Sequence, residues 1–194
     1  MGEPVRGRPA AAMLHADPKH LARLAAELDR VLVLDPQPYA AKMVGEVLRQ
    51  IGAKHVAFAA HTERALELIA HYEPQLVCTE HTVGAFHGVA LVAALRRSAL
   101  PSRKAPVVMI AGEATVEGIK AARDAGAHEF LRKPFNARDL FRRVENVMLQ
   151  PRPWIDAQMY VGPDRRRFNA GEFRGPRKRR ADRPEPAAYM DLAS

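Results

Sequence analysis

Between residues 30 and 150, short apolar runs alternate five times with segments of helical periodicity. A continuously apolar run such as Val31–Leu34 is typical of a strand buried on both faces, as found in parallel sheets. Strands are predicted at residues 31–34, 54–59, 75–79, 106–110 and 129–131, and helices at residues 39–50, 62–71, 89–95, 115–125 and 136–149. This alternation predicts an α/β fold, a doubly wound parallel sheet with helices on both faces. The functional crevice of such a sheet lies at the carboxyl ends of its strands.

The flanking segments differ from this unit in composition. Residues 1–16 are rich in Gly, Pro and Ala, and we expect them to be disordered. Residues 17–29 are predicted to form a short leader helix, because Asp17 and Pro18 are typical of a helix start. Residues 151–194 hold 6 of the 15 prolines and little apolar periodicity, which predicts a mostly disordered or extended tail. The repeating unit itself is assigned to residues 30–150.

Simple counts exclude several classes of protein. No apolar run approaches the roughly 18 residues of a membrane-spanning helix. The N-terminus lacks the continuous apolar stretch of a secretory signal. The single cysteine, Cys78, cannot form an internal disulfide, and no Cys/His spacing suggests a zinc site. We therefore expect a cytoplasmic protein without membrane insertion, metal ion or cofactor.

The repeating unit resembles the CheY-like receiver domain of bacterial response regulators. The resemblance covers about residues 30–150 and implies a flavodoxin-like (βα)5 fold. It rests on four segments: VLVLDPQP (Val31–Pro38), PQLVCTEHTVGAFHG (Pro74–Gly88), PVVMIAGEA (Pro106–Ala114) and GAHEFLRKPF (Gly126–Phe135).

Three positions depart from the phosphorylation site that this resemblance implies. Receivers usually carry two adjacent acids after the first strand, which help to hold magnesium, but here Asp35 is followed by Pro36. The phosphoacceptor aspartate is replaced by Glu80, whose longer side chain is poorly placed for in-line attack on a phosphodonor. The hydroxyl residue that senses the phosphoryl group is replaced by Ala111, whereas Lys133 is retained. The resemblance therefore implies a degenerate phosphoacceptor pocket without catalytic residues, in a protein that is not an enzyme.

Two interpretations of Glu80 stay open at this point. Its carboxylate could mimic the phosphorylated state by reaching toward Lys133 as a fixed anion. Alternatively, the pocket has decayed, and Glu80 and Lys133 form a structural ion pair. Glu80→Gln should change partner binding only under the first interpretation.

The tail concentrates positive charge and aromatic residues. Between Arg165 and Arg183, nine Lys or Arg residues stand against two Asp or Glu. Arginine pairs bidentately with phosphate and with the guanine edge, and it stacks on bases as Trp and Tyr do. An internal repeat places an aromatic residue, Gly-Pro and three basic residues at 160–167 and again at 173–180. These residue types together favour a ligand that carries both phosphates and guanines.

A receiver without phosphorylation residues, followed by Gly-Pro-x-Arg-Arg-Arg, resembles the Cle subfamily of CheY-like cyclic di-GMP effectors. In that subfamily the arginine-rich segment binds the dinucleotide, and the protein then acts at the flagellar motor switch. The resemblance implies a non-catalytic signalling adaptor with both of these partners. The implied contacts with cyclic di-GMP are Arg152, Trp154, Asp156, Tyr160, Asp164, Arg165, Arg166, Arg167, Arg174, Arg177 and Arg179. The surface implied for the protein partner comprises residues 116–125, 130–133 and 138–147.

Other functions are compatible with a basic tail. A phosphorylation-independent regulator that binds DNA or RNA would also use clustered arginines, and a basic extension can simply be solvated. Aromatic residues and Gly-Pro turns favour the dinucleotide, because a purely electrostatic tail needs neither. Binding through many phosphates should also weaken steeply with salt, whereas a stacked dinucleotide should lose affinity more gently.

Overall fold

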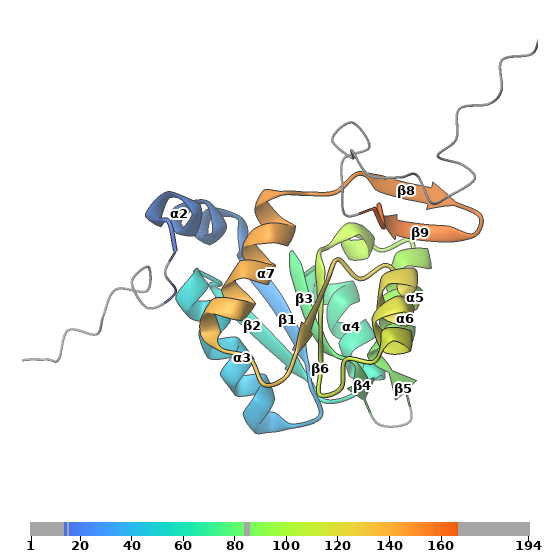
Figure 1. Cartoon of the computed structure of the whole chain (residues 1–194), viewed down its shortest axis with the longest axis horizontal. Helices are drawn as coiled ribbons and strands as arrows, with labels where there is room; N and C mark the ends of the chain where they lie inside the picture. Colours follow the sequence, from blue (N-terminus) through green and yellow to red (C-terminus); the bar gives the residue numbers. More distant parts are fainter. Residues whose placement is uncertain (1–13, 15, 84–85, 167–194) are drawn as a thin grey trace, which may run out of the picture.

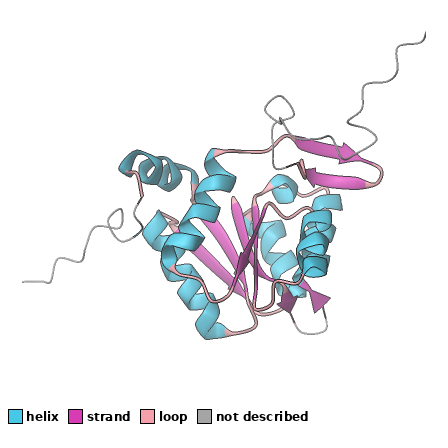
Figure 2. Ribbon diagram, in the orientation of Figure 1, coloured by secondary structure: helices cyan, strands magenta, loops and turns pink. Residues whose placement is uncertain are grey.

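The computed structural model describes residues 14, 16–83 and 86–166 of the 194-residue chain. Five parallel strands form one sheet in the order β2-β1-β3-β6-β7. Their bounds are β1 (Arg30–Leu34), β2 (His55–Ala59), β3 (Leu76–Glu80), β6 (Val107–Ala111) and β7 (Glu129–Arg132). The predicted doubly wound α/β fold is confirmed (Figures 1 and 2).

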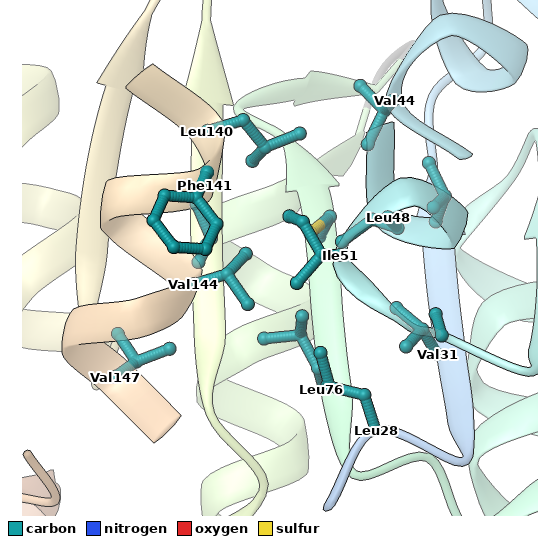
Figure 3. Close-up of a cluster of buried hydrophobic side chains, with 14 of the residues drawn as sticks. Leu28, Val31, Val44, Leu48, Ile51, Leu76, Leu140, Phe141, Val144 and Val147 are labelled. Carbon is teal, nitrogen blue, oxygen red and sulfur yellow. The ribbon is translucent and has the colours of Figure 1, made fainter. Parts of the chain in front are cut away.

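Helices cover both faces of the sheet because successive strand residues face opposite ways. On β1, Val31 and Val33 join one buried cluster, with side chains of α2 (Pro18–Glu27), α3 (Pro38–Ile51) and α7 (Ala137–Leu149). Figure 3 shows part of this cluster, in which Val44 and Leu48 of α3 lie near Leu140 and Val144 of α7.

The second cluster fills the opposite face of the sheet. Leu32 and Leu34 of β1 pack there against α4 (Thr62–Tyr72), α5 (Gly88–Arg97) and α6 (Val116–Ala125). The two clusters cover both faces of the sheet. The strand ends and the loops that follow them are therefore the parts of the sheet available to form a functional site.

The leader helix is present as α2. The Asp17 side chain accepts a hydrogen bond from the Lys19 backbone N–H at 2.8 Å, which caps the helix as the sequence predicts. Leu24 and Leu28 are fully buried, and the helix lies beside α7. Among the described residues, no helix is both long and apolar enough to cross a membrane.

Three short elements were not predicted. A hairpin of two strands with two residues each, β4 (Thr82–Val83) and β5 (Phe86–His87), follows β3. A 3-10 helix, η1 (Pro101–Lys104), precedes β6. Segments this short carry no periodicity that a sequence pattern could reveal.

Within the tail that the sequence predicts to be mostly disordered or extended, residues 154–163 form an ordered pair of extended strands. Strands β8 (Trp154–Ala157) and β9 (Tyr160–Pro163) form an antiparallel hairpin, with Trp154 opposite Pro163 and Ala157 opposite Tyr160. Figure 1 shows this hairpin beside the ends of α5 and α6. A lone two-stranded hairpin is marginal in water, so this one depends on its contacts with the α/β unit.

Candidate functional site

A cleft of about 530 Å³ opens at the carboxyl ends of the strands. Asp35 follows β1, Glu80 ends β3, Ala111 ends β6 and Lys133 follows β7. These strands are neighbours in the sheet, so its topology alone brings the four side chains to one place. They are the residues that the sequence assigns to the degenerate phosphoacceptor pocket.

The Lys133 ammonium lies between two carboxylates. Its Nζ donates to Asp35 Oδ2 at 3.1 Å and also to Glu80 Oε2. The second oxygen of each carboxylate accepts from a backbone N–H, that of Gln37 for Asp35 at 2.8 Å and that of His81 for Glu80 at 3.0 Å. The side chains of Asp35, Glu80 and Lys133 are 5%, 11% and 29% exposed. All four carboxylate oxygens therefore have a donor, and the charges are largely withdrawn from water.

Electrostatics hold Lys133 in its charged form. Burial alone would lower the pKa of its ammonium, but the hydrogen bonds from Lys133 to Glu80 and Asp35 outweigh this, and the pKa is raised. The Lys133 ammonium therefore stays charged throughout the neutral range. Both interpretations of Glu80 contain this contact with Lys133.

The residues present do not fit a magnesium ion. Magnesium needs an octahedral set of oxygens, several of them free to point inward. Here the position between Asp35 and Glu80 is filled by a side-chain cation, and Pro36 supplies no second carboxylate. Within the described part of the chain, no group of three or more His, Cys, Asp or Glu residues is arranged to hold a metal.

Ala111 removes a further part of a phosphoryl site. It is 1% exposed, lines the cleft and has no hydroxyl group to donate to a phosphoryl oxygen. The geometry thus supports a fixed ion-pair network rather than phosphoryl transfer.

The hairpin β8–β9 docks at the opposite, amino-terminal end of the sheet, around the buried Arg96. This side chain is only 1% exposed. Its guanidinium donates to the carbonyls of Gly126 at 3.0 Å, Arg103 at 2.6 Å and Ala105 at 3.0 Å. Trp154 of β8 covers it, with the guanidinium carbon 5.4 Å from the ring centroid. Arg96 therefore joins α5, the η1 loop, the α6–β7 loop and the hairpin.

Burial changes the titration of this cluster. It lowers the pKa of Arg96 to about 10, against the raising effect of Tyr160. The neighbouring His128 has its pKa lowered to about 3 by burial and by the charges of Arg96 and Arg152. Neutral His128 accepts at Nδ1 from the Val107 N–H at 3.1 Å and lies 3.2 Å from Arg96 Nη2.

Arg152 anchors the start of the tail. Its Nη2 donates to Glu129 Oε1 at 2.9 Å, and the same buried carboxylate accepts from Arg143 and Asn146 of α7. Asp156 of β8 pairs with Arg103 of η1. Both tail residues are thus engaged by the α/β unit.

The first copy of the internal repeat has a defined local structure. The Tyr160 hydroxyl donates to the Pro163 carbonyl at 2.6 Å, and the ring is 8% exposed. Gly162 has no room for a Cβ, which would lie 2.6 Å from Tyr160 Oη and 3.0 Å from Gly126 Cα. Arg165 covers the Tyr160 ring, with its guanidinium carbon 4.3 Å from the centroid. The aromatic, Gly-Pro and first arginine positions therefore form one packed turn.

The predicted ligand contacts divide into three groups. Arg152, Trp154, Asp156, Tyr160 and Arg165 contact the α/β unit or each other, as described above. Asp164 Oδ1 accepts from the Arg166 backbone at 3.0 Å, while the exposed Arg166 guanidinium makes no hydrogen bond or ion pair with a described residue. The remaining predicted contacts, Arg167, Arg174, Arg177 and Arg179, lie outside the described residues.

Sequence reasoning missed the residues that hold the hairpin and its flanks, Arg96, Glu129 and Asp124, and it missed His128, which lies against Arg96. Arg96 stands beside Arg97 at a helix end, where basic residues are common, so nothing in the sequence signals its burial. Glu129 begins a strand, where a charged residue is usually exposed. Only the tertiary contacts with the tail assign these roles.

Comparisons with known proteins concern the α/β unit. Residues 31–145 match the family model of the response regulator receiver domain. The transcriptional regulatory protein PdtaR of Mycobacterium tuberculosis is 29% identical over 116 residues, which cover 60% of this chain and 55% of PdtaR. The chemotaxis protein CheY of Rhizobium etli is 23% identical over 122 residues, 63% of this chain and 94% of that protein. The chain thus spans little more than half the length of PdtaR but almost all of CheY.

Solved structures show the same fold. A response regulator from Chloroflexus aurantiacus superposes with a TM-score of 0.59 at 27% identity, covering 63% of this chain and 98% of that one. A chemotaxis response regulator of Vibrio cholerae has a TM-score of 0.56 at 24% identity, covering 62% of this chain and 99% of its own.

Proposed function

The chain belongs to the response regulator receiver family, and we propose that it is a member that works without phosphorylation and binds cyclic di-GMP. In this proposal it is a non-catalytic cytoplasmic adaptor. The dinucleotide binds to the arginine-rich tail, and the liganded protein then contacts a protein partner, the flagellar motor switch.

The occupied pocket supports independence from phosphorylation. A phosphodonor would have to displace Lys133 from both carboxylates, and the acceptor itself would be Glu80, whose oxygens already accept from Lys133 and from His81. Neither a magnesium site nor a hydroxyl sensor accompanies it. In this proposal, the input signal enters through another part of the chain.

The tail is the part that offers such an input. The family match ends at residue 145, so the hairpin and the arginine run are additions of this chain to the receiver unit. The observation that carries the proposal is that the run begins at a fixed point. Arg165 follows a docked hairpin, and the exposed Arg166 guanidinium makes no hydrogen bond or ion pair with a described residue. Anchoring one end lowers the ordering entropy that a tail must lose when it closes on a small ligand.

Calorimetry on the full chain tests the ligand. We expect saturable heat with cyclic di-GMP and at least a tenfold weaker affinity in the double variant Arg166→Ala/Arg167→Ala, because two bidentate contacts are removed. The matched control is Arg138→Ala/Arg142→Ala, which removes two exposed charges from α7. No heat with the wild-type chain would contradict the proposal.

The motor-switch partner needs its own measurement. Immobilised flagellar motor switch protein should retain the full chain when cyclic di-GMP is present and release it when the dinucleotide is omitted. The Arg166→Ala/Arg167→Ala variant should not be retained in either condition. Retention that ignores the dinucleotide would contradict this part of the proposal.

A nucleic-acid-binding regulator is the second candidate. Two relatives, PdtaR and the phosphate regulon protein PhoB of Escherichia coli, are named as transcriptional regulatory proteins; PhoB is 27% identical over 149 residues, 74% of this chain and 64% of PhoB. Binding to duplex DNA should then weaken steeply with salt. A loss of affinity of roughly a hundredfold or more between 50 and 200 mM salt would favour this candidate over cyclic di-GMP.

A further inference from the structure

Arg165, the first residue of the arginine run, is held by the α/β unit through Asp124. Its Nη1 donates to Asp124 Oδ1 at 2.8 Å, while its guanidinium covers the Tyr160 ring. Asp124 lies in the last turn of α6, and Arg165 follows β9 by two residues. An ion pair therefore ties the beginning of the tail to this helix.

Asp124 stands where its charge does not help the helix. The last turn of a helix carries the negative end of the macrodipole, so a carboxylate there is unfavourable. Although partial burial would raise the pKa of Asp124, hydrogen bonds from Arg165 and Arg123 outweigh it, and the pKa lies below its usual value. The carboxylate is thus satisfied by arginines, one of them from the tail.

Arg165 is placed to exchange the Asp124 carboxylate for another anion. The side chains of Arg165 and Asp124 are 41% and 48% exposed, and an exposed ion pair contributes little to stability. A phosphodiester offers the same guanidinium two oxygens in bidentate geometry. Replacing Asp124 by such a ligand costs the protein little.

We infer that the Asp124 carboxylate competes with the phosphate of the ligand for the guanidinium of Arg165. It holds Arg165 on α6 while the tail is empty and gives it up when cyclic di-GMP binds. This inference rests on the proposed function. Because α6 belongs to the surface implied for the protein partner, the exchange links occupation of the tail to that surface.

Asp124→Asn measures the competition. A ligand that must first displace an internal anion binds with its intrinsic affinity multiplied by the fraction of Arg165 that is free. Removing the competitor should therefore tighten cyclic di-GMP binding by up to about fivefold, the limit for an exposed ion pair. The matched control is Glu117→Gln, an equal change of charge at an exposed position of the same helix, which should bind as the wild type does.

Hydrogen exchange of the full chain supplies a second measurement that general charge effects do not move. In the wild type, cyclic di-GMP should speed exchange of the amides of residues 121–126, because Arg165 leaves the helix end. In Asp124→Asn these amides should exchange fast already and respond no further to the ligand.

The outcomes separate the two proposals. Equal affinity of Asp124→Asn and wild type, or equal tightening by Asp124→Asn and Glu117→Gln, overturns the competition and leaves cyclic di-GMP binding intact. Absence of binding by the wild-type chain overturns the proposed function, and the competition with it.

Discussion

At the scale of single residues, Lys133 decides what the receiver pocket can do. It satisfies Asp35 and Glu80 at once, and the backbone N–H groups of Gln37 and His81 take the remaining oxygens. A carboxylate whose oxygens are all engaged in this way is a poor nucleophile. The lysine that would contact the phosphoryl group in a phosphorylated receiver is here already bound to Asp35 and Glu80.

A double-mutant cycle on Glu80→Gln and Lys133→Met measures this commitment. We expect a coupling free energy of about 1–2 kcal/mol from urea unfolding, because the pair is largely withdrawn from solvent. The Arg64–Glu67 pair of α4, whose side chains are 60% and 62% exposed, is the control and should couple by about 0.3–0.5 kcal/mol. Coupling no larger than that of the control would contradict the described network.

His128 predicts a pH dependence of stability. Its pKa of about 3 in the folded chain lies below the 6.5 of an unperturbed histidine, so the unfolded chain binds the proton first as pH falls. The contribution of neutral His128 is therefore complete above about pH 6.5 and is lost progressively toward pH 3. We expect the free energy of unfolding to fall by about 2 kcal/mol between pH 7.5 and pH 5.

The variant His128→Asn keeps an acceptor near the position of Nδ1 and does not titrate. Its unfolding free energy should be lower at pH 7.5 but nearly flat down to pH 5. His71→Asn, at an exposed helix position, should keep the slope of the wild type. A wild-type slope in His128→Asn would assign the pH dependence to other groups.

At the scale of elements, the hairpin β8–β9 depends on one close approach. Gly162→Ala places a Cβ against Tyr160 and Gly126, and its φ of 157° adds backbone strain. We expect this variant to detach the hairpin, so that the emission of Trp154, the single tryptophan, shifts to the red. Gly112→Ala, whose Cβ would meet nothing within 4 Å, should leave the emission unchanged. An unshifted spectrum in Gly162→Ala would mean that the turn is not tightly packed.

The elements themselves show what a sequence can and cannot predict. The five sheet strands and the helices from α2 to α7 lie within one or two residues of the predicted bounds, because each carries its own periodicity and end signals. The convergence of Asp35, Glu80, Ala111 and Lys133 follows from the same pattern, since parallel strands share their carboxyl edge. The hairpin could not be predicted in this way. Arg96, Glu129 and Asp124 hold it or its flanking residues from 23 or more positions away in the sequence, and none of them carries a local signal.

At the scale of the whole molecule, the two sites occupy opposite ends of the sheet. The carboxylate–lysine network lies at the carboxyl end, and the docked hairpin with the first arginines of the run lies at the amino end. Helix α6 spans the distance between them, with Thr115 near the cleft and Asp124 paired to the tail. Under the proposed function, a ligand bound to the tail would therefore act on α6 without passing through the phosphoacceptor pocket.

The amide spectrum of the uniformly ¹⁵N-labelled full chain tests this account most directly. Titrated with cyclic di-GMP, it should show saturable shifts for residues 119–126, 160–162 and 164–166 and none for residues 35, 80, 111 and 133. Addition of acetyl phosphate with magnesium should shift no amide of the cleft. Shifts at residues 80, 111 and 133 with acetyl phosphate, and none in the tail with cyclic di-GMP, would contradict it and show a receiver that is still driven by phosphorylation.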